Sequence, residues 1–185
     1  MHHSTSKFLS PEQAAEIVAH LPPFASSVLV THLSAPEEIL PILKVTNTTT
    51  VQLHGNTTPD QATYIKKELP FLKTYKAIHV FDDSAVDDAR RYIGFVDGII
   101  LDTAIRATGQ VGGTGQTHDW SISRKVVRSI DLPVILAGGL NPDNVLEAVR
   151  LVQPYAVDVN SGVTKPNGEK DHEKLRQFIA RAKSA

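Results

Sequence analysis

Cysteine is absent from all 185 residues of the chain. Its absence excludes disulfides, thiolate metal sites and thiol nucleophiles. Long apolar runs are also missing, since none approaches the roughly 20 residues that a membrane helix requires. The polar start, Met1-His-His-Ser-Thr-Ser6, lacks the apolar core of a signal peptide. We therefore expect no membrane association and no metal site, and the lack of disulfides fits a cytoplasmic location.

An excess of charge of either sign is absent as well. The chain holds 19 lysines and arginines against 20 aspartates and glutamates, which gives a formal net charge of -1. Acidic and basic residues are interleaved, so the sequence offers no basic patch for nucleic acid or for an anionic membrane. The expected partner is therefore a small molecule and not a nucleic acid.

Short apolar runs typical of buried strands are what the chain does contain. Six of them recur about every 23–25 residues, with one longer interval after the fourth, which is the length of one strand, one helix and two loops. They are Val28–Leu33, Thr50–Leu53, Tyr75–Val80, Gly98–Leu101, Pro133–Ala137 and Ala156–Val159. No linker or low-complexity tract divides them, so a single domain over residues 1–185 is expected.

Helix starts lie between the runs. Three of them share a capping side chain, a proline at the first helical position and an acidic residue: Ser10-Pro-Glu-Gln13, Thr58-Pro-Asp-Gln61 and Asn141-Pro-Asp-Asn144. Strands that alternate with helices predict an α/β fold with a parallel sheet and right-handed crossovers. Because an eight-stranded barrel needs about 200 residues or more, six units indicate either an open doubly wound sheet or a barrel lacking its first quarter.

Two glycine-bearing turns follow the last two predicted strands. Gly138 and Gly139 come after the fifth strand, and Ser161 and Gly162 come after the sixth. Glycine lets backbone N–H groups approach a ligand closely, and two such turns after neighbouring strands form an anion cradle. The pattern predicts a phosphorylated small molecule as ligand.

Three titratable residues lie at or near predicted strand ends. Asp102 follows four apolar residues, where it could act in catalysis or simply cap a turn. Asp158 lies between two valines and could be a functional carboxylate or a buried structural acceptor. His54 ends a strand and can accept a proton near neutral pH, although a hydrogen-bonded structural histidine is the simpler interpretation.

Five motifs in this order resemble the phosphoribosylanthranilate isomerase family of tryptophan biosynthesis. They are Val51-Gln-Leu-His-Gly55, Leu101-Asp-Thr103, Gly112-Gly-Thr-Gly115 with Asp119-Trp120, Leu136–Val145, and Val157–Val163 with Gly168–Asp171. The resemblance runs from about Ser6 to the C-terminus. It implies a (β/α)8 barrel of the TIM type, of which this chain would lack about the first two strands and the first helix, leaving about six βα units.

The resemblance also implies an activity. The family converts an N-ribosylanthranilate phosphate to a 1-amino-1-deoxyribulose phosphate by an Amadori rearrangement, without a cofactor. Asp102 matches the general acid, and Asp158 matches a second functional aspartate. The turns predicted above to bind phosphate match the family's phosphate site. Further substrate contacts are expected from His54 and from Lys7, Gly112, Gly113 and Gly115.

Two departures from the family pattern bear on activity. The family's base is a cysteine in a Lys-x-Cys-Gly strand, which this chain does not contain. Lys7 stands where the family usually places arginine, and a lysine lacks the bidentate fork that suits a carboxylate. Losing the base should cost on the order of 10²–10⁴ in rate.

Three explanations of the missing strand stay open. The recorded start could be wrong, or a second copy or complementing chain could cover the open barrel edges near Val28–Leu33 and Ala156–Val159. In the third, the chain is a catalytically impaired relic or a regulatory module that binds phosphate. A related barrel class, the sugar-phosphate isomerases of the histidine pathway, is an alternative enzyme. It typically carries two similar phosphate sites, whereas only one is evident here.

Overall fold

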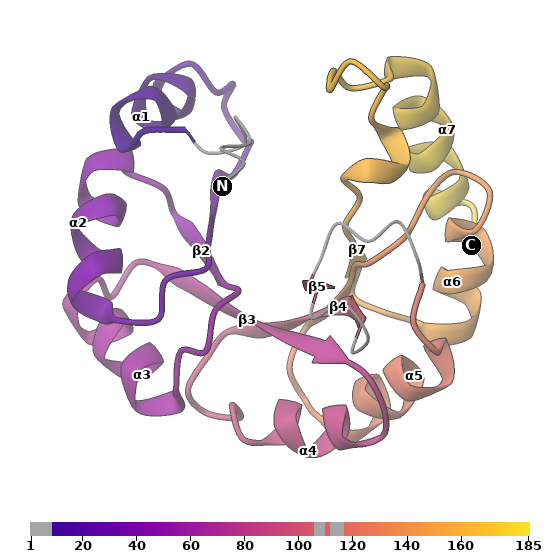
Figure 1. Cartoon of the computed structure of the whole chain (residues 1–185), viewed down its shortest axis with the longest axis horizontal. Helices are drawn as coiled ribbons and strands as arrows, with labels where there is room; N and C mark the ends of the chain where they lie inside the picture. The colour runs from indigo at the N-terminus through magenta and orange to yellow at the C-terminus, as the bar shows by residue number, and fades with distance from the viewer. Residues whose placement is uncertain (1–8, 106–109, 112–116) are drawn as a thin grey trace. The chain divides into compact units, whose positions relative to one another are not determined.

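The computed structural model describes residues 9–105, 110–111 and 117–185 (Figure 1). The chain divides into two compact units, Met1–Tyr75 and Lys76–Ala185. The single domain expected over residues 1–185 stays a prediction. Both units alternate helices with parallel strands, so the fold is α/β, as expected.

The first unit contains three helices and two complete strands. In chain order they are α1 (Pro11–Ala19), β1 (Val28–Thr31), α2 (Pro36–Thr46), β2 (Thr50–Leu53) and α3 (Pro59–Glu68), followed by the start of β3 (Lys73–Val80). β1 and β2 pair in parallel from Val28 opposite Thr50 to Thr31 opposite Leu53. Ile39, Val51 and Ile65 are fully buried and form the centre of its core.

The predicted starts of α1 and α3 are confirmed. In α3, the Thr58 hydroxyl accepts a hydrogen bond from the Gln61 N–H at 3.3 Å, and the Gln61 side chain accepts one from the Thr58 N–H at 2.8 Å. Ser10 and Gln13 make the same reciprocal pair at the start of α1. Each pair satisfies two donors that the first turn of a helix otherwise leaves without an acceptor.

The second unit contains the rest of β3 and the remaining elements. They are α4 (Ser84–Arg90), β4 (Gly98–Ile105), β5 (Gln110–Val111), α5 (Trp120–Ser129), β6 (Val134–Leu136), α6 (Val145–Val152), β7 (Ala156–Val157), the 3-10 turn η1 (Ser161–Val163) and α7 (His172–Lys183). The strand order is β3-β4-β6-β7, and β5 pairs antiparallel with β4. β4, β6 and β7 are parallel.

Helices α4 to α7 pack in sequence, each against the next, as Figure 1 shows for this unit. The strands are buried beneath them: Ile99, Leu101 and Leu136 are fully enclosed. Strands covered in this way read as near-continuous apolar runs, which is the pattern seen in the sequence. Among the residues that the structure describes, no helix has the length and apolar character needed to cross a membrane.

Among the boundaries that differ from the sequence prediction, three bear on the site. β4 continues past Asp102 to Ile105, because the strand leaves its parallel partner and pairs with β5 instead. β7 ends at Val157, so Asp158 lies just beyond it. α6 begins at Val145 and not at Pro142, since the Asn141 side chain accepts from the Asp143 N–H and holds the chain in a turn first.

β1 leaves apolar surface uncovered, as is expected of a strand at the edge of a sheet. It lies at the end of the strand order in its unit, and the exposed fractions of Val28 and Val30 are 51% and 53%. β7 ends the order in the second unit. Exposed apolar edge strands are surfaces on which a further strand can pair.

The capping pair of α3 gives a stability test. Thr58→Ala removes the hydroxyl acceptor, so we expect the free energy of unfolding to fall by about 1 kcal/mol. Thr58→Ser, which keeps the hydroxyl, should lose much less. Urea unfolding of the three proteins measures both differences, and equal losses in the two variants would argue against the cap.

Candidate active site at the strand ends of the second unit

Strand register brings two carboxylates into one row. Leu101 pairs with Leu136, and Leu136 pairs with Val157, so the next row across the sheet is Asp102, Ala137 and Asp158. The hydrogen bonds from Ala137 N to Leu101 O (2.8 Å) and from Asp158 N to Leu136 O (2.9 Å) continue the pairing into this row. Residues in register on parallel strands project to the same face.

The residue between the two aspartates, Ala137, has a small side chain and is buried. Two strand spacings separate the Asp102 and Asp158 Cα atoms by roughly 9–10 Å. Side chains that project from this row toward one another can therefore approach the same small molecule. The row also stands at the carboxyl ends of the parallel strands, where ligands bind in α/β sheets.

Asp102 is buried, with 9% of its surface exposed. Its Oδ1 accepts a hydrogen bond from the Thr103 N–H at 2.7 Å. Burial raises the pKa of Asp102 above its usual value, the Thr103 N–H opposes that rise, and the negative charge of Asp158 adds to it. The net effect favours the protonated acid, which can donate a proton.

Asp158 has a different environment. Desolvation raises its pKa, while a hydrogen bond from the Val159 N–H and the positive charge of Lys170 lower it. Its side chain remains accessible to water, which limits the desolvation. Burial therefore raises the pKa of both carboxyl groups, but Lys170 offsets part of the rise at Asp158, whereas the charge of Asp158 adds to the rise at Asp102.

The two glycine turns lie against each other. A Cβ added to Gly162 would strike the carbonyl of Leu140 and come within 2.9 Å of the Asn141 Cβ, so the turn after β7 packs on the turn after β6. Gly138 and Gly139 have φ angles of 80° and 68°. This left-handed backbone suits glycine, and it aims peptide groups in directions that ordinary strand ends do not.

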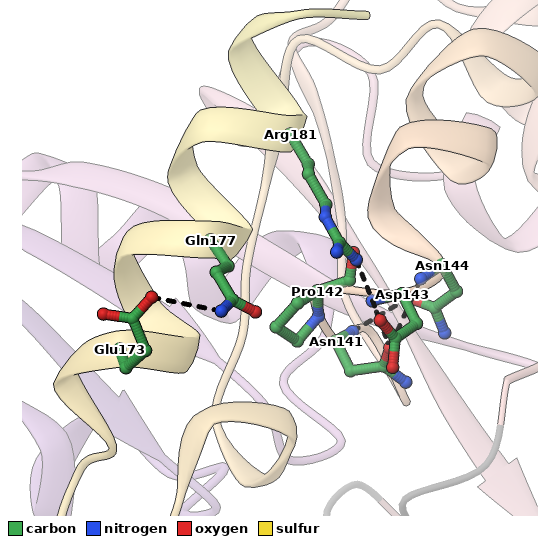
Figure 2. Close-up of polar contacts among 7 residues, drawn as sticks. All are labelled: Asn141, Pro142, Asp143, Asn144, Glu173, Gln177 and Arg181. Carbon is green, nitrogen blue, oxygen red and sulfur yellow. Dashed lines mark hydrogen bonds and ion pairs between the residues drawn. The ribbon is translucent and has the colours of Figure 1, made fainter.

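Side chains hold the turn after β6 in shape. The Asn144 side chain donates to Gly139 O at 3.0 Å and accepts from the Asn141 N–H at 2.8 Å. From α7, Arg181 donates to Pro142 O at 2.6 Å and to Asp143 Oδ1 at 2.8 Å, as Figure 2 shows. The last helix therefore fastens the glycine turn that precedes α6.

The turn after β7 is fastened by a lysine. Lys170 Nζ donates to Asn160 Oδ1 at 2.6 Å and to Thr164 Oγ1 at 3.0 Å. The same ammonium group lowers the pKa of Asp158, as described above. Sequence reasoning gave no supporting role to Lys170, Arg181 or Asn144. Arg181 meets residues 38 and 39 positions away, which only the fold brings near, whereas Lys170 and Asn144 contact residues within ten positions of themselves.

The sequence analysis also missed the contact between His118 and Thr103. His118 Nδ1 lies 2.9 Å from Thr103 Oγ1, and its Nε2 lies 2.5 Å from Ser123 Oγ. Ser123 is fully buried, and 4% of the Thr103 surface is exposed. The contact joins β4 to α5 beside Asp102.

The other predicted site residues are not among those that the structure gathers at these strand ends. His54 belongs to the first unit, where it is buried and its ring meets His32 edge-on at 4.5 Å between centroids. Its Nδ1 lies 3.3 Å from Gln52 Nε2. Lys7 and three glycines of the predicted loop lie outside the described residues: Gly112, Gly113 and Gly115.

Comparison with known proteins identifies the family. The family model of N-(5'-phosphoribosyl)anthranilate isomerase matches residues 1–181. The chain belongs to this family.

Its relatives include the phosphoribosylanthranilate isomerase 2 of Methanosarcina mazei, 44% identical over 182 residues, which are 98% of this chain and 80% of the relative. The isomerase of Methanocella arvoryzae is also 44% identical, over 92% of this chain and 79% of the relative.

Solved phosphoribosylanthranilate isomerases share the fold. The structure of the Thermotoga maritima isomerase superposes with a TM-score of 0.83 at 36% identity, covering 96% of this chain and 82% of the other. The Pyrococcus furiosus isomerase gives 0.80 at 30% identity, covering 100% and 86%. A third isomerase structure, with a TM-score of 0.80 and 34% identity over 96% and 81%, is in complex with reduced 1-(o-carboxyphenylamino)-1-deoxyribulose 5-phosphate.

Gly138 and Gly94 form a matched pair for testing the glycine turn. Both have left-handed φ angles, but a Cβ at Gly138 would collide with Thr103 whereas a Cβ at Gly94 meets nothing within 4 Å. Gly94→Ala should cost about 1–2 kcal/mol of unfolding free energy from the backbone alone. Gly138→Ala should cost about 1–3 kcal/mol more from overpacking. Urea unfolding compares them, and equal losses would contradict the close packing of Gly138 on Thr103.

Proposed function

We propose that the protein rearranges N-(5-phosphoribosyl)anthranilate to 1-(carboxyphenylamino)-1-deoxyribulose 5-phosphate in tryptophan biosynthesis. The observation that carries the proposal is the row of Asp102 and Asp158 beside two touching glycine turns, in a chain of this isomerase family. One solved relative is in complex with a reduced form of that product. The substrate class is therefore a sugar phosphate with an aromatic amine at C1.

Asp102 is the general acid in this proposal. Opening the ribose ring requires a proton on the ring oxygen as the bond from C1 breaks, and the anthranilate nitrogen supplies the electron pair that forms the C1–N double bond. A buried carboxyl group with a raised pKa holds the proton that this step needs. The Thr103 N–H keeps the carboxyl group oriented.

Asp158 stabilises the intermediate. Ring opening leaves a positive charge on the nitrogen, and an ionised carboxylate two strands away from the acid can offset it. Removal of the proton at C2 then gives an enolamine, and protonation at C1 gives the ketose product. The positive charge of Lys170 favours the ionised form of Asp158, and the negative charge of Asp158 favours the protonated form of Asp102, which suits an electrostatic partner and an acid respectively.

The phosphate binds to the backbone of the two glycine turns. The N–H groups of Gly138 and Gly139 after β6 and of Ser161 and Gly162 after β7 are the expected donors, because both turns lie at one corner of the site. Backbone donors at helix starts bind anions without needing a cationic side chain. Arg181 and Lys170 support this site by fastening the turns from outside.

The base and the further substrate contacts are proposed for other residues. The 185 residues contain no cysteine, so none of them supplies a thiol as the base at C2. His54 is retained as a proposed substrate-binding residue and as a candidate proton acceptor. Lys7 and the glycines at 112, 113 and 115 are retained as proposed substrate contacts, and the reaction is proposed to need no cofactor. A cytoplasmic location likewise stays a prediction.

The histidine-pathway alternative is not favoured, because the family model and the relatives described above are those of phosphoribosylanthranilate isomerases. A binding relic without turnover differs from the proposal in activity and not in fold. Turnover by the purified chain therefore decides between the enzyme and the relic.

The decisive variant is Asp102→Asn. Turnover, measured by the loss of the fluorescence of N-(5-phosphoribosyl)anthranilate, should fall by about 10²–10⁴ because the acid is lost. Asp131→Asn, on the exposed surface before β6, serves as the control and should keep wild-type activity. Wild-type turnover that Asp102→Asn leaves unchanged would refute the role of Asp102.

The Asp102→Asn variant, which should lose activity, should gain stability against unfolding at neutral pH. Because the folded protein raises the pKa of Asp102, the stability that the protonated form provides is present in acid and is lost as the pH rises through that pKa. Asparagine stays neutral, so Asp102→Asn should unfold at higher urea than wild type at pH 7, with the difference shrinking toward pH 3. A destabilised variant at pH 7 would contradict the burial argument.

For the rest of the barrel, we propose that the exposed outer edge of β1 pairs with a further strand, either from a second copy or from a complementing chain. The exposed valines of β1 support this, and the chain spans about four-fifths of its curated relatives. A Thermotoga maritima isomerase to which the chain is similar is described as dimeric. An eight-unit barrel has two strands and one helix more than the six strands of the parallel order and the seven helices of the described residues.

Light scattering after size exclusion tests the second-copy version. Val30→Lys places a charge on the exposed apolar edge of β1 and should lower the dimer fraction. Val45→Lys, on the exposed side of α2, should leave it unchanged. A wild-type chain that stays monomeric at the highest soluble concentration would exclude self-association and leave the complementing chain.

A further inference from the structure

His118 links three parts of the second unit. It precedes α5 directly, and its two ring nitrogens contact Thr103 at the end of the parallel part of β4 and Ser123 inside α5. Both partners are buried. Because each ring nitrogen contacts a buried hydroxyl group, the two contacts together fix the orientation of the imidazole ring.

The imidazole is neutral in this position. Burial lowers the pKa of His118 to about 4, and the neighbouring carboxylate of Asp119 opposes that shift only in part. A neutral imidazole has one donor and one acceptor nitrogen. The two hydroxyl groups can therefore pair with it as one donor and one acceptor, which leaves both nitrogens satisfied.

Thr103 is the junction through which His118 reaches the proposed site. Its N–H donates to Asp102 Oδ1 at 2.7 Å. Its backbone nitrogen also lies 2.5 Å from where a Cβ of Gly138 would be, so the first glycine turn packs directly on it. A shift of Thr103 would therefore move the proposed acid and the proposed phosphate turn together.

We propose that His118 is a positioning residue that holds Thr103 through its Nδ1, and so sets Asp102 relative to the sugar phosphate held at Gly138 and Gly139. The inference rests on the proposed function. In this inference, His118 does not touch the substrate and acts on Asp102 through Thr103 of β4.

Two amide variants separate this role from simple packing. The amide of His118→Asn can replace the Nδ1 contact with Thr103 but not the contact with Ser123. The longer His118→Gln can replace the Nε2 contact with Ser123 but not the contact with Thr103. His118→Phe keeps a planar ring and removes both contacts.

We expect kcat to fall by about 10–100-fold in the Gln and Phe variants, because small misplacements of a catalytic group carry losses of this size. The Asn variant should stay within about threefold of wild type. The pKa of Asp102, followed by carbon NMR with aspartate labelled at the carboxyl and Asp102→Asn for assignment, should rise in the Gln variant, since the Thr103 N–H that lowers it is no longer held.

Equal effects of Asn and Gln on kcat and on the Asp102 titration would overturn the proposal in favour of packing alone. An Asp102 titration that overlays wild type in all three variants would also overturn it. Circular dichroism and thermal melting identify any variant that fails to fold. If the wild-type chain shows no turnover, the proposed function fails, and the NMR titration still decides the role of His118.

Discussion

The parallel pairing of β4, β6 and β7 is the constraint on which the site depends. Its register places Asp102, Ala137 and Asp158 in one row, and it places the glycine turns directly beyond that row. A shift of one residue in either strand would send a carboxylate to the opposite face of the sheet. The buried residues of the preceding row, Leu101 and Leu136, oppose such a shift because it would expose them.

The burial that suits Asp102 to the proposed role of acid lowers the free energy of unfolding at neutral pH. Burying Asp102 disfavours its charged form, and the nearby Asp158 disfavours it further. Asp158 itself keeps access to water and is near Lys170. Desolvation raises the pKa of both side chains, but the neighbouring charge acts in opposite senses, since Asp158 adds to the rise at Asp102 and Lys170 offsets part of the rise at Asp158.

The supporting residues explain why the site extends beyond the residues that meet substrate. Arg181 fastens the turn after β6 from α7, Lys170 fastens the turn after β7, and His118 fastens Thr103 from the start of α5. Each uses a hydrogen bond to a turn or strand end that otherwise would have more freedom. Preorganised groups of this kind reduce the reorganisation that a reaction requires.

The sequence alone determined the alternation of strands and helices, the caps of α1 and α3, and the glycine turns after β6 and β7. Apolar periodicity and capping are properties of neighbouring residues, and the ordered motifs indicated the family. Only the tertiary structure decided that β4 continues beyond Asp102 and that His118 meets Thr103, 15 residues earlier in the chain. These features depend on contacts between residues distant in sequence, and no local pattern encodes such contacts.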